Sequence, residues 1–327
     1  MNSVLIIDKP SGLTSHDVVA RVRRILGQRS VGHLGTLDPM ATGVLPLVIG
    51  SFTRLAQFYT HAEKTYEGVI RFGFSTTTYD AEGEPTSSPQ PVTLDPDQID
   101  ILAAKFRGVI EQTPPPFSAK KIHGVPAYKL ARKQKEVILA PVQVEIKEFE
   151  ILSVLSDRVQ FRARVASGTY MRCVAQDMGQ ALACGAHLES LRRTAVAEFT
   201  LADAHTLDEL ENVARAPSPA CPVGTTDSSP PVLLAGSPAQ NDPRPVGTPE
   251  SLDSLFIHPR KLLPQLPSVT ADDATAARIR TGRTVNLPEL SRARQVKVFH
   301  GQRDLIAIAT RVAGTLFHPK IVLCGSD

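Results

Sequence analysis

The amino-acid sequence predicts an α+β fold, with a large domain on a mixed, largely antiparallel sheet and a small β-rich C-terminal domain. Segments with strand periodicity and segments with helix periodicity follow one another without the regular strand–helix–strand repeat of a parallel sheet. A proline-rich stretch at residues 214–251 interrupts the chain, and mainly strand-like segments follow it. The 327 residues are 42% hydrophobic, which suffices for the cores of about two domains.

The first expected elements are a strand, a helix and a loop. The apolar run Val4–Ile7 predicts a short strand. Ser15 is placed to cap a helix over Asp17–Leu26, whose apolar residues share one face. Three glycines and a proline within Gly32–Gly43 predict a loop with special backbone angles, and the apolar segment Val44–Ile49 predicts a buried strand after it.

Further strands and helices are expected in the middle of the chain. Asp95 and Pro96 together form a helix start signal, with a capping side chain followed by proline at the first helical position. A second helix is expected from Tyr170 to Ala183, and Gly185 is a natural terminator for it. Alternating apolar residues predict strands over residues 64–73, 142–146 and 159–165.

The proline-rich stretch suggests the domain organisation. Residues 214–251 contain nine of the 26 prolines, no aromatic residue and few large apolar side chains. Such a segment buries too little surface to offset its ordering entropy, so we expect a disordered insertion. The predicted domains are residues 1–251, including this insertion, and residues 252–327.

The C-terminal domain is the more basic part of the chain. Residues 268–327 contain nine Lys and Arg against five Asp and Glu, an excess of 9 − 5 = +4, whereas the whole chain has a net charge of +3. A solvated basic face and a nucleic-acid contact surface both fit this excess. The overall charge is compatible with a polyanionic partner without requiring one.

Several classes of protein are disfavoured. The four cysteines form no C-x-x-C pair and no histidine cluster accompanies them, so we expect neither a structural metal nor disulfides. The N-terminal apolar run is too short for a signal peptide, and no stretch approaches the ~20 apolar residues that span a membrane. We therefore expect a cytoplasmic protein.

The loop Gly32–Gly43 is the strongest candidate for a functional site. Asp38 precedes Pro39, which disfavours helical backbone angles at Asp38 and lets its side chain project. An aspartate before proline is more often a turn residue whose side chain bonds the nearby backbone. Taken alone, the loop leaves both interpretations open.

Five motifs in order give the chain a family resemblance. Besides the loop, they are Lys9–Ser15 (KPSGLTS), Gln112–Lys121 (QTPPPFSAKK), Gly168–Arg172 (GTYMR), and Gly185–Leu188 with Leu191–Arg193. Together they resemble the TruB-type tRNA pseudouridine synthases over nearly the whole chain. Gly282-Arg283 and Leu305–Ala309 resemble that family's C-terminal PUA-type RNA-binding domain. The resemblance implies a pseudouridine-synthase catalytic domain followed by a PUA-like domain.

The resemblance also implies roles for individual residues. Asp38 falls on the family's essential aspartate, and Tyr66 on the tyrosine that stacks on the target uracil. His33 falls on the residue that fills the gap left by the flipped base. The other positions expected at the pocket or near the RNA are Tyr170, Arg172, Leu191, Asp80, Lys121 and Lys9, the last of these in the N-terminal motif. The implied partner is tRNA, modified at position 55 of its T-arm loop by a monomer without guide RNA, cofactor or metal.

The chemistry of these residue types suits that reaction. A carboxylate can act as nucleophile or stabilise charge on the sugar, and an adjacent Arg172 would hold it in place. Two rivals remain: a non-catalytic RNA-binding protein or tRNA-folding chaperone, and an RNA-guided pseudouridine synthase. The set of Asp38, Tyr66 and Arg172 argues against the first, and the loop's continuation Met40–Pro46, as in the stand-alone bacterial type, against the second.

Overall fold

In the computed structural model of the chain, the described residues are 1–118, 120–122, 124–127, 130, 133, 139–215 and 251–323. Within these, ten strands form one sheet, whose main path runs β12-β1-β3-β10-β4-β9-β8-β5. Two neighbouring pairs, β1–β12 and β3–β10, are parallel and the others are antiparallel, as predicted from the sequence. The strands are β1 (Ser3–Lys9), β2 (Val31–His33), β3 (Thr42–Ile49), β4 (Lys64–Phe72), β5 (Gly108–Gln112), β8 (Val142–Leu155), β9 (Arg158–Val165), β10 (Ala186–Val196), β11 (Phe199–Thr200) and β12 (Ala204–His205).

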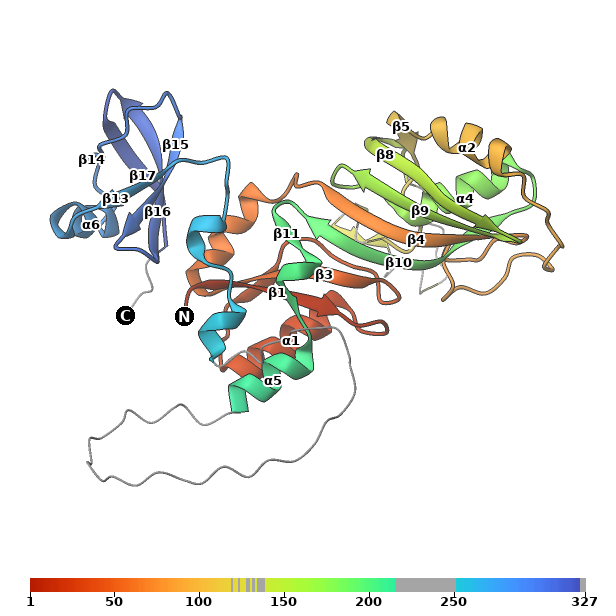
Figure 1. Cartoon of the computed structure of the whole chain (residues 1–327), viewed down its shortest axis with the longest axis horizontal. Helices are drawn as coiled ribbons and strands as arrows, with labels where there is room; N and C mark the ends of the chain where they lie inside the picture. Colours follow the sequence, from red (N-terminus) through yellow and green to blue (C-terminus); the bar gives the residue numbers. More distant parts are fainter. Residues whose placement is uncertain are drawn as a thin grey trace, which may run out of the picture.

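Helices cover different parts of this sheet. In Figure 1, α1 and α5 lie together beside β1, whereas α2 and α4 lie at the other end, near β8 and β9. The helices are α1 (Ser15–Leu26), α2 (Pro96–Ala104), α4 (Met171–Ala181) and α5 (Leu207–Arg215), and a two-stranded hairpin pairs β6 (Lys121–Ile122) with β7 (Val125–Pro126). Among the described residues, no helix combines the length and apolar character needed to cross a membrane.

The start of α1 differs from the sequence prediction. The cap is Thr14, which exchanges hydrogen bonds with Asp17 in a capping box. Ser15 is the first helical residue and is buried. Its hydroxyl accepts a hydrogen bond from the Leu37 N–H at 2.8 Å and donates one to the Leu37 carbonyl at 3.2 Å. The helix start therefore anchors the loop that carries Asp38.

Strand β10 was not predicted, yet it joins the two halves of the sheet. It pairs in parallel with β3 at Arg192 and Arg193 and antiparallel with β4 along most of its length. The backbones of β3 and β10 approach each other closely at Gly43: a Cβ added to this residue would come 2.2 Å from the Arg193 carbonyl oxygen. Its polar residues and two register shifts hide the alternation that identifies the other strands.

The expected insertion is seen only at its ends. Helix α5 continues through Ala214 and Arg215, the first two residues of the predicted insertion, so ordered structure extends further than expected. Residues 216–250 lie outside the described residues. At the other end, Ser251 precedes a short 3₁₀ helix, η3 (Leu252–Leu255).

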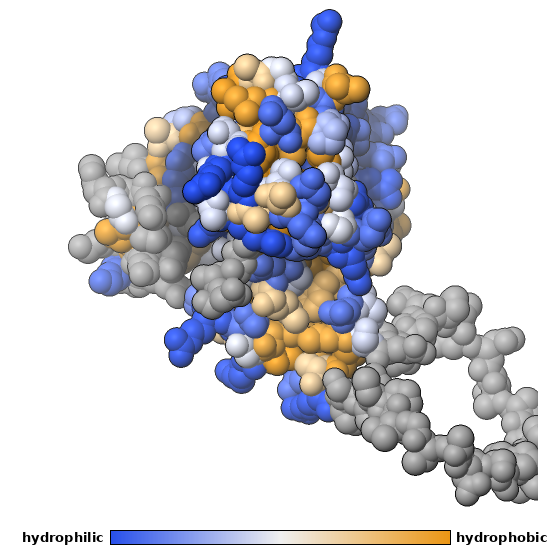
Figure 2. Space-filling view, turned by 90° about the vertical axis from the view of Figure 1, so that its left-hand side faces the viewer, coloured by the Kyte–Doolittle hydropathy of each residue, from blue (hydrophilic) through white to orange (hydrophobic). Residues whose placement is uncertain are grey.

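The C-terminal sheet begins later than the predicted domain boundary. Its five strands follow the order β13-β15-β16-β17-β14 and carry one helix. Before it, Leu255 packs in the core of the large domain, and the Ile257 N–H bonds the Val4 carbonyl at 2.9 Å. Figure 2, with the C-terminal domain toward the viewer, shows hydrophilic side chains spread over this end with apolar areas between them. The elements are β13 (Ser268–Ala271), α6 (Asp273–Arg280), β14 (Val285–Asn286), β15 (Gln295–His300), β16 (Asp304–Ala313) and β17 (Leu316–Val322), with 3₁₀ helices η1 (Gly50–Phe58), η2 (Leu201–Asp203) and η4 (Pro259–Lys261) elsewhere in the chain.

Candidate active site

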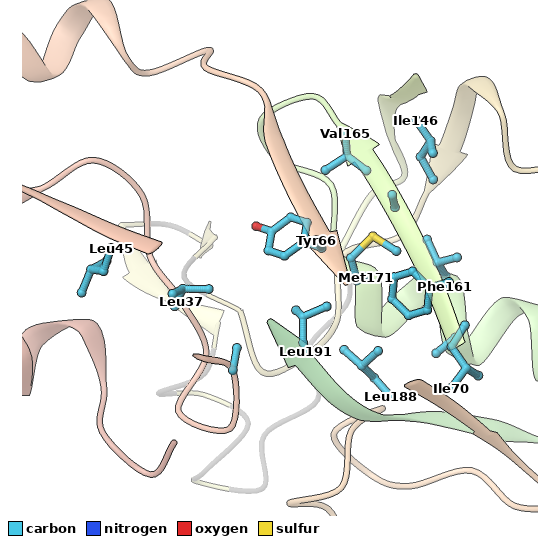
Figure 3. Close-up of a cluster of buried hydrophobic side chains, with 14 of the residues drawn as sticks. Leu37, Leu45, Tyr66, Ile70, Ile146, Phe161, Val165, Met171, Leu188 and Leu191 are labelled. Carbon is cyan, nitrogen blue, oxygen red and sulfur yellow. The ribbon is translucent and has the colours of Figure 1, made fainter. Parts of the chain in front are cut away.

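A cavity of about 760 Å³ lies where the sheet, the loop that follows β2 and the start of α4 meet. Its walls are of two kinds. One is apolar and includes Leu37, Tyr66, Met171 and Leu191. In Figure 3, Leu37 and the Tyr66 ring face each other, with Leu191 beside them. The other wall is charged and includes Asp38, Asp80 and Arg172. The cavity thus offers an apolar surface for a planar ring beside a group of ionised side chains.

Asp38 and Arg172 form an ion pair in this cavity. The Arg172 Nε lies 2.9 Å from Asp38 Oδ2, and Nη2 donates a hydrogen bond to Oδ1 at 3.2 Å. The Nε–H does not point along its short contact, so the hydrogen bond from Nη2 is the directed one. The Arg172 side chain is only 5% exposed, whereas that of Asp38 is 34% exposed. The carboxylate therefore faces the cavity while its partner is fixed behind it.

The same guanidinium holds other parts of the site. Nη1 donates to the Thr78 carbonyl at 3.1 Å, and Nη2 donates to the Phe117 carbonyl at 3.0 Å. Nη1 also lies 3.5 Å from Oδ2 of Asp80, whose side chain is 4% exposed. Asp80 in turn accepts hydrogen bonds from the Thr78 hydroxyl and from the Glu82 N–H. Arg172 thus joins two carboxylates and two segments of backbone, and a shorter cation would not span them.

Tyr170 lies at the start of α4 on the cavity wall. Its N–H donates to the Gln112 side-chain oxygen at 2.8 Å, and its carbonyl accepts from the Gln112 amide at 3.1 Å. Burial raises the pKa of the Tyr170 hydroxyl, so the phenol stays protonated at neutral pH. The structure therefore brings Tyr66, Tyr170 and Leu191 together around Asp38, Asp80 and Arg172.

The loop that presents Asp38 is held from beneath by Arg193. This side chain is fully buried in β10. It donates to the carbonyls of Gly35 at 3.0 Å, Thr36 at 3.1 Å and Val44 at 2.8 Å. Sequence reasoning assigned Arg193 only to a motif, because nothing in the sequence shows that its donors point inward to the backbone of this loop.

Lys9 has a different place from the one expected. The sequence placed it among residues that contact RNA, but it is fully buried at the end of β1. Its ammonium donates to the carbonyls of Pro10 at 2.8 Å, Leu13 at 2.6 Å and Pro39 at 3.0 Å. Burial lowers its pKa to about 8. With all three donors used, Lys9 holds the loop next to Asp38 and has none left for a ligand.

His33, another predicted residue, is absent from the residues that line the cavity. His33 ends β2, and its Nδ1 accepts a hydrogen bond from the Gly35 N–H at 3.4 Å. Burial, and then the charge of Arg193, lower its pKa, so the ring is neutral at pH 7. Lys121 is the first residue of β6, and its side chain lies outside what the structure describes. Two residues that sequence reasoning did not name as site residues, His16 and Lys64, do line the cavity.

A substitution of Lys9 tests its positioning role. Replacing Lys9 with Met leaves three buried carbonyls without their donor, so we expect a loss of about 1–3 kcal/mol of stability. We also expect a slower single-turnover reaction with nearly unchanged RNA affinity. Urea unfolding, rates at saturating enzyme and binding curves measure the three effects. Weaker binding at unchanged rate and stability would mean that Lys9 contacts RNA directly.

Comparison with known proteins agrees with this geometry. Residues 23–171 match the model of the N-terminal domain of the TruB family pseudouridylate synthases, and residues 172–218 match that of the tRNA pseudouridylate synthase B C-terminal domain. The chain is 45% identical to the tRNA pseudouridine synthase B of Solibacter usitatus, over 99% of this chain and all of that protein. It is 36% identical to that of an Azoarcus species, over 93% of this chain and 90% of that protein.

Solved structures show the same fold at lower identity. A chain from the crystal structure of a Cbf5-Nop10-Gar1 complex superposes with a TM-score of 0.67 at 23% identity, covering 99% of this chain and 85% of that chain. A chain from the archaeal box H/ACA Nop10-Cbf5 complex gives a TM-score of 0.65. These show a mixed α+β catalytic domain followed by a β-rich domain. With the whole-chain identity to the Solibacter protein, the chain belongs to the TruB family of tRNA pseudouridine synthases, isomerases that act on tRNA.

Proposed function

We propose that the enzyme converts one uridine, at position 55 in the T-arm loop of tRNA, to pseudouridine, with Asp38 as the essential catalytic carboxylate. The observation that carries this is the Asp38–Arg172 ion pair on the wall of a cavity that also presents Tyr66 and Leu191. A folded RNA loop hides its bases, so the target must be extruded at a cost of a few kcal/mol. The apolar side of the cavity receives the extruded uracil, and stacking on Tyr66 returns part of that cost.

The reaction rearranges atoms without adding any. The N1–C1′ glycosidic bond breaks, the uracil turns, and C5 forms a new bond to C1′. The C5 hydrogen leaves to a base and N1 takes up a proton, so the product is an isomer. Asp38 acts at the break, as nucleophile or by stabilising charge on the sugar. Arg172 holds the carboxylate in a fixed orientation, because it contacts both Asp38 oxygens from a buried position.

The protonated phenol of Tyr170 suits the proton-transfer step. It lines the same cavity as Asp38, and its raised pKa favours an acid over a phenolate. We assign to it the relay of the proton that leaves C5: the phenol oxygen takes up this proton while the hydroxyl passes its own proton on to water, so Tyr170 ends the step as a phenol again. Asp80 acts at one remove, because it is buried and reaches the reacting groups through Arg172.

The rival functions differ in what they require. A non-catalytic RNA chaperone needs a basic surface but no carboxylate held in place on the wall of a cavity. An RNA-guided enzyme needs a second RNA before it can act. The test is incubation of the purified chain with an unmodified tRNA transcript whose uridines carry tritium at C5. We expect tritium release with this tRNA alone, and none at the target when cytidine replaces it. Release only after a guide RNA is added would favour the guided enzyme.

The C-terminal domain is proposed to grip the tRNA away from the active site. A concave surface on it is lined by two cationic residues, Arg294 and Lys320, with Thr310 and His318. Cations of this kind neutralise phosphates and make binding depend on salt. We expect the double change Arg294→Gln and Lys320→Gln to lower the salt dependence of tRNA affinity and to spare the rate in the bound state. An unchanged salt dependence would contradict this role.

We also propose that the enzyme acts as a monomer. The Asp38–Arg172 ion pair is complete within one chain. Sedimentation of the enzyme alone and with tRNA should give one chain per particle at concentrations where it turns over. A concentration-dependent specific activity would point to an oligomer instead.

A further inference from the structure

Lys64 is a buried cation on the cavity wall, and among the residues that the structure describes no carboxylate pairs with it. It is the first residue of β4 and is 8% exposed. Its ammonium donates to the Ala62 carbonyl at 2.6 Å, and within the described part of the chain no other acceptor and no carboxylate contacts it. An ammonium has three donors, so two remain. Lys9, in contrast, uses all three on backbone carbonyls.

The electrostatic surroundings of Lys64 are unfavourable in the free protein. Burial, followed by the positive charge of Arg193, lowers its pKa to about 8. Arg193 cannot neutralise the charge of Lys64, because it is itself a cation. Its fully buried guanidinium donates to three carbonyls. An unpaired buried cation destabilises a fold. Stability therefore does not account for a lysine at this position, and a ligand that brings negative charge would.

The position of Lys64 lies beside the catalytic loop. Lys64 and Tyr66 are two residues apart on β4, so their side chains project from the same face of the strand, and both line the cavity. A Cβ added to Gly35 would lie 3.6 Å from the Lys64 Cε, which places the lysine against the loop three residues before Asp38. Figure 3 shows the Tyr66 ring from this strand facing Leu37 of the same loop.

We propose that Lys64 binds a phosphodiester oxygen of the tRNA backbone next to the extruded uridine. The inference rests on the proposed function, since it assumes that a nucleotide enters this cavity. Uracil is neutral and offers an ammonium only weak electrostatic attraction, whereas the phosphate of each nucleotide brings one full negative charge. Extrusion turns the nucleotide about its backbone, so its flanking phosphates come to the cavity together with the base. Such a contact offsets the free-energy cost of burying the Lys64 ammonium, and it does so only in the complex.

Lys64→Met removes the charge and keeps most of the length of the side chain. We expect tRNA affinity to fall roughly ten- to a hundredfold, as for loss of a hydrogen bond to a charged group. The slope of log affinity against log salt should become less steep by about one phosphate's share. Thermal stability should stay the same or rise, because the buried cation is gone. Lys64→Arg should recover part of the affinity. The control is Lys147→Met, which removes an exposed lysine paired with Glu63 outside the cavity.

Removing the charge from the RNA instead of from the protein identifies the phosphate that Lys64 binds. Full-length tRNAs are assembled with a neutral methylphosphonate on the 5′ or the 3′ side of the target uridine. We expect one of the two substituted tRNAs to bind the wild-type enzyme more weakly than unsubstituted tRNA does. For Lys64→Met, the same methylphosphonate should cause no further loss of affinity. Independent, additive losses at both positions would overturn the proposal. So would unchanged affinity of Lys64→Met, or a fall in its stability at wild-type affinity.

If the proposed function itself is wrong, the experiments give a different result. In that case the wild-type enzyme would release no C5 tritium from the unsubstituted tRNA, whatever the behaviour of Lys64→Met. If only the Lys64 proposal is wrong, the wild-type enzyme isomerises the uridine normally and the methylphosphonate effects do not depend on residue 64.

Discussion

Asp38→Asn should abolish isomerisation while tRNA still binds. The asparagine keeps the size of the side chain, and its oxygen can still accept the hydrogen bond from Arg172 Nη2. It lacks the negative charge that a nucleophile or a charge stabiliser requires. We expect single-turnover tritium release to fall at least about a thousandfold. Affinity should change by only a few fold, since phosphate contacts and base stacking lie elsewhere.

The turn-residue interpretation of Asp38 predicts the opposite result. Asparagine makes such turns as well as aspartate does, so near-normal turnover would remove the catalytic assignment. A matched control is Asp157→Asn. Asp157 is likewise paired with arginine, in its case with Arg71 at 2.9 Å and Arg158 at 2.8 Å, and it does not line the cavity. We expect this variant to turn over normally.

Arg172→Met should reduce both activity and stability. It leaves the buried Asp80 without its cation, and breaking such a buried pair typically costs about 3–5 kcal/mol. It also frees Asp38 to rotate, and misplacing a reacting group by about 1 Å can cost roughly a hundredfold in rate. Arg172→Lys should recover part of the stability but little of the rate, because one ammonium cannot hold two carboxylates and two carbonyls.

The measurement combines urea unfolding with single-turnover rates at temperatures where each variant is folded. Arg162→Met is the control, since Arg162 pairs with Glu67 at 2.8 Å but is half exposed. Removing such a surface pair should cost less than about 1 kcal/mol and no activity. Equal losses in the Arg172 and Arg162 variants would show that Arg172 has no special place in the site.

Local signals predicted much of the secondary structure and the proposed pocket. Strands β4 and β9 were visible because one face of each is apolar, and α2 because Asp95 caps it and Pro96 follows. The family motifs named Tyr66, Tyr170, Arg172, Leu191 and Asp80 as neighbours of Asp38, and the structure places all of them on one cavity.

Features that depend on tertiary burial were not visible. Strand β10 carries arginines at 192 and 193, and only the sheet shows that Arg193 turns inward to loop carbonyls. Lys9 and Lys64 look alike in the sequence. The ammonium of Lys9 donates to three backbone carbonyls, whereas that of Lys64 donates to one among the described residues and lines the cavity. The choice between Thr14 and Ser15 as the cap of α1 was equally hidden, because Ser15 is drawn to Leu37 on a distant segment.

The most direct test of the proposed reaction is a nucleotide-resolution map of pseudouridine in tRNA. A transcript free of modifications is incubated with the purified wild-type enzyme and no other RNA or protein, and Asp38→Asn is treated in parallel. We predict one new pseudouridine, at position 55 in the T-arm loop, with the wild-type enzyme and none with the variant. Pseudouridine at another position, or equal conversion by Asp38→Asn, would contradict the assignment of this pocket and of Asp38 as its catalytic group.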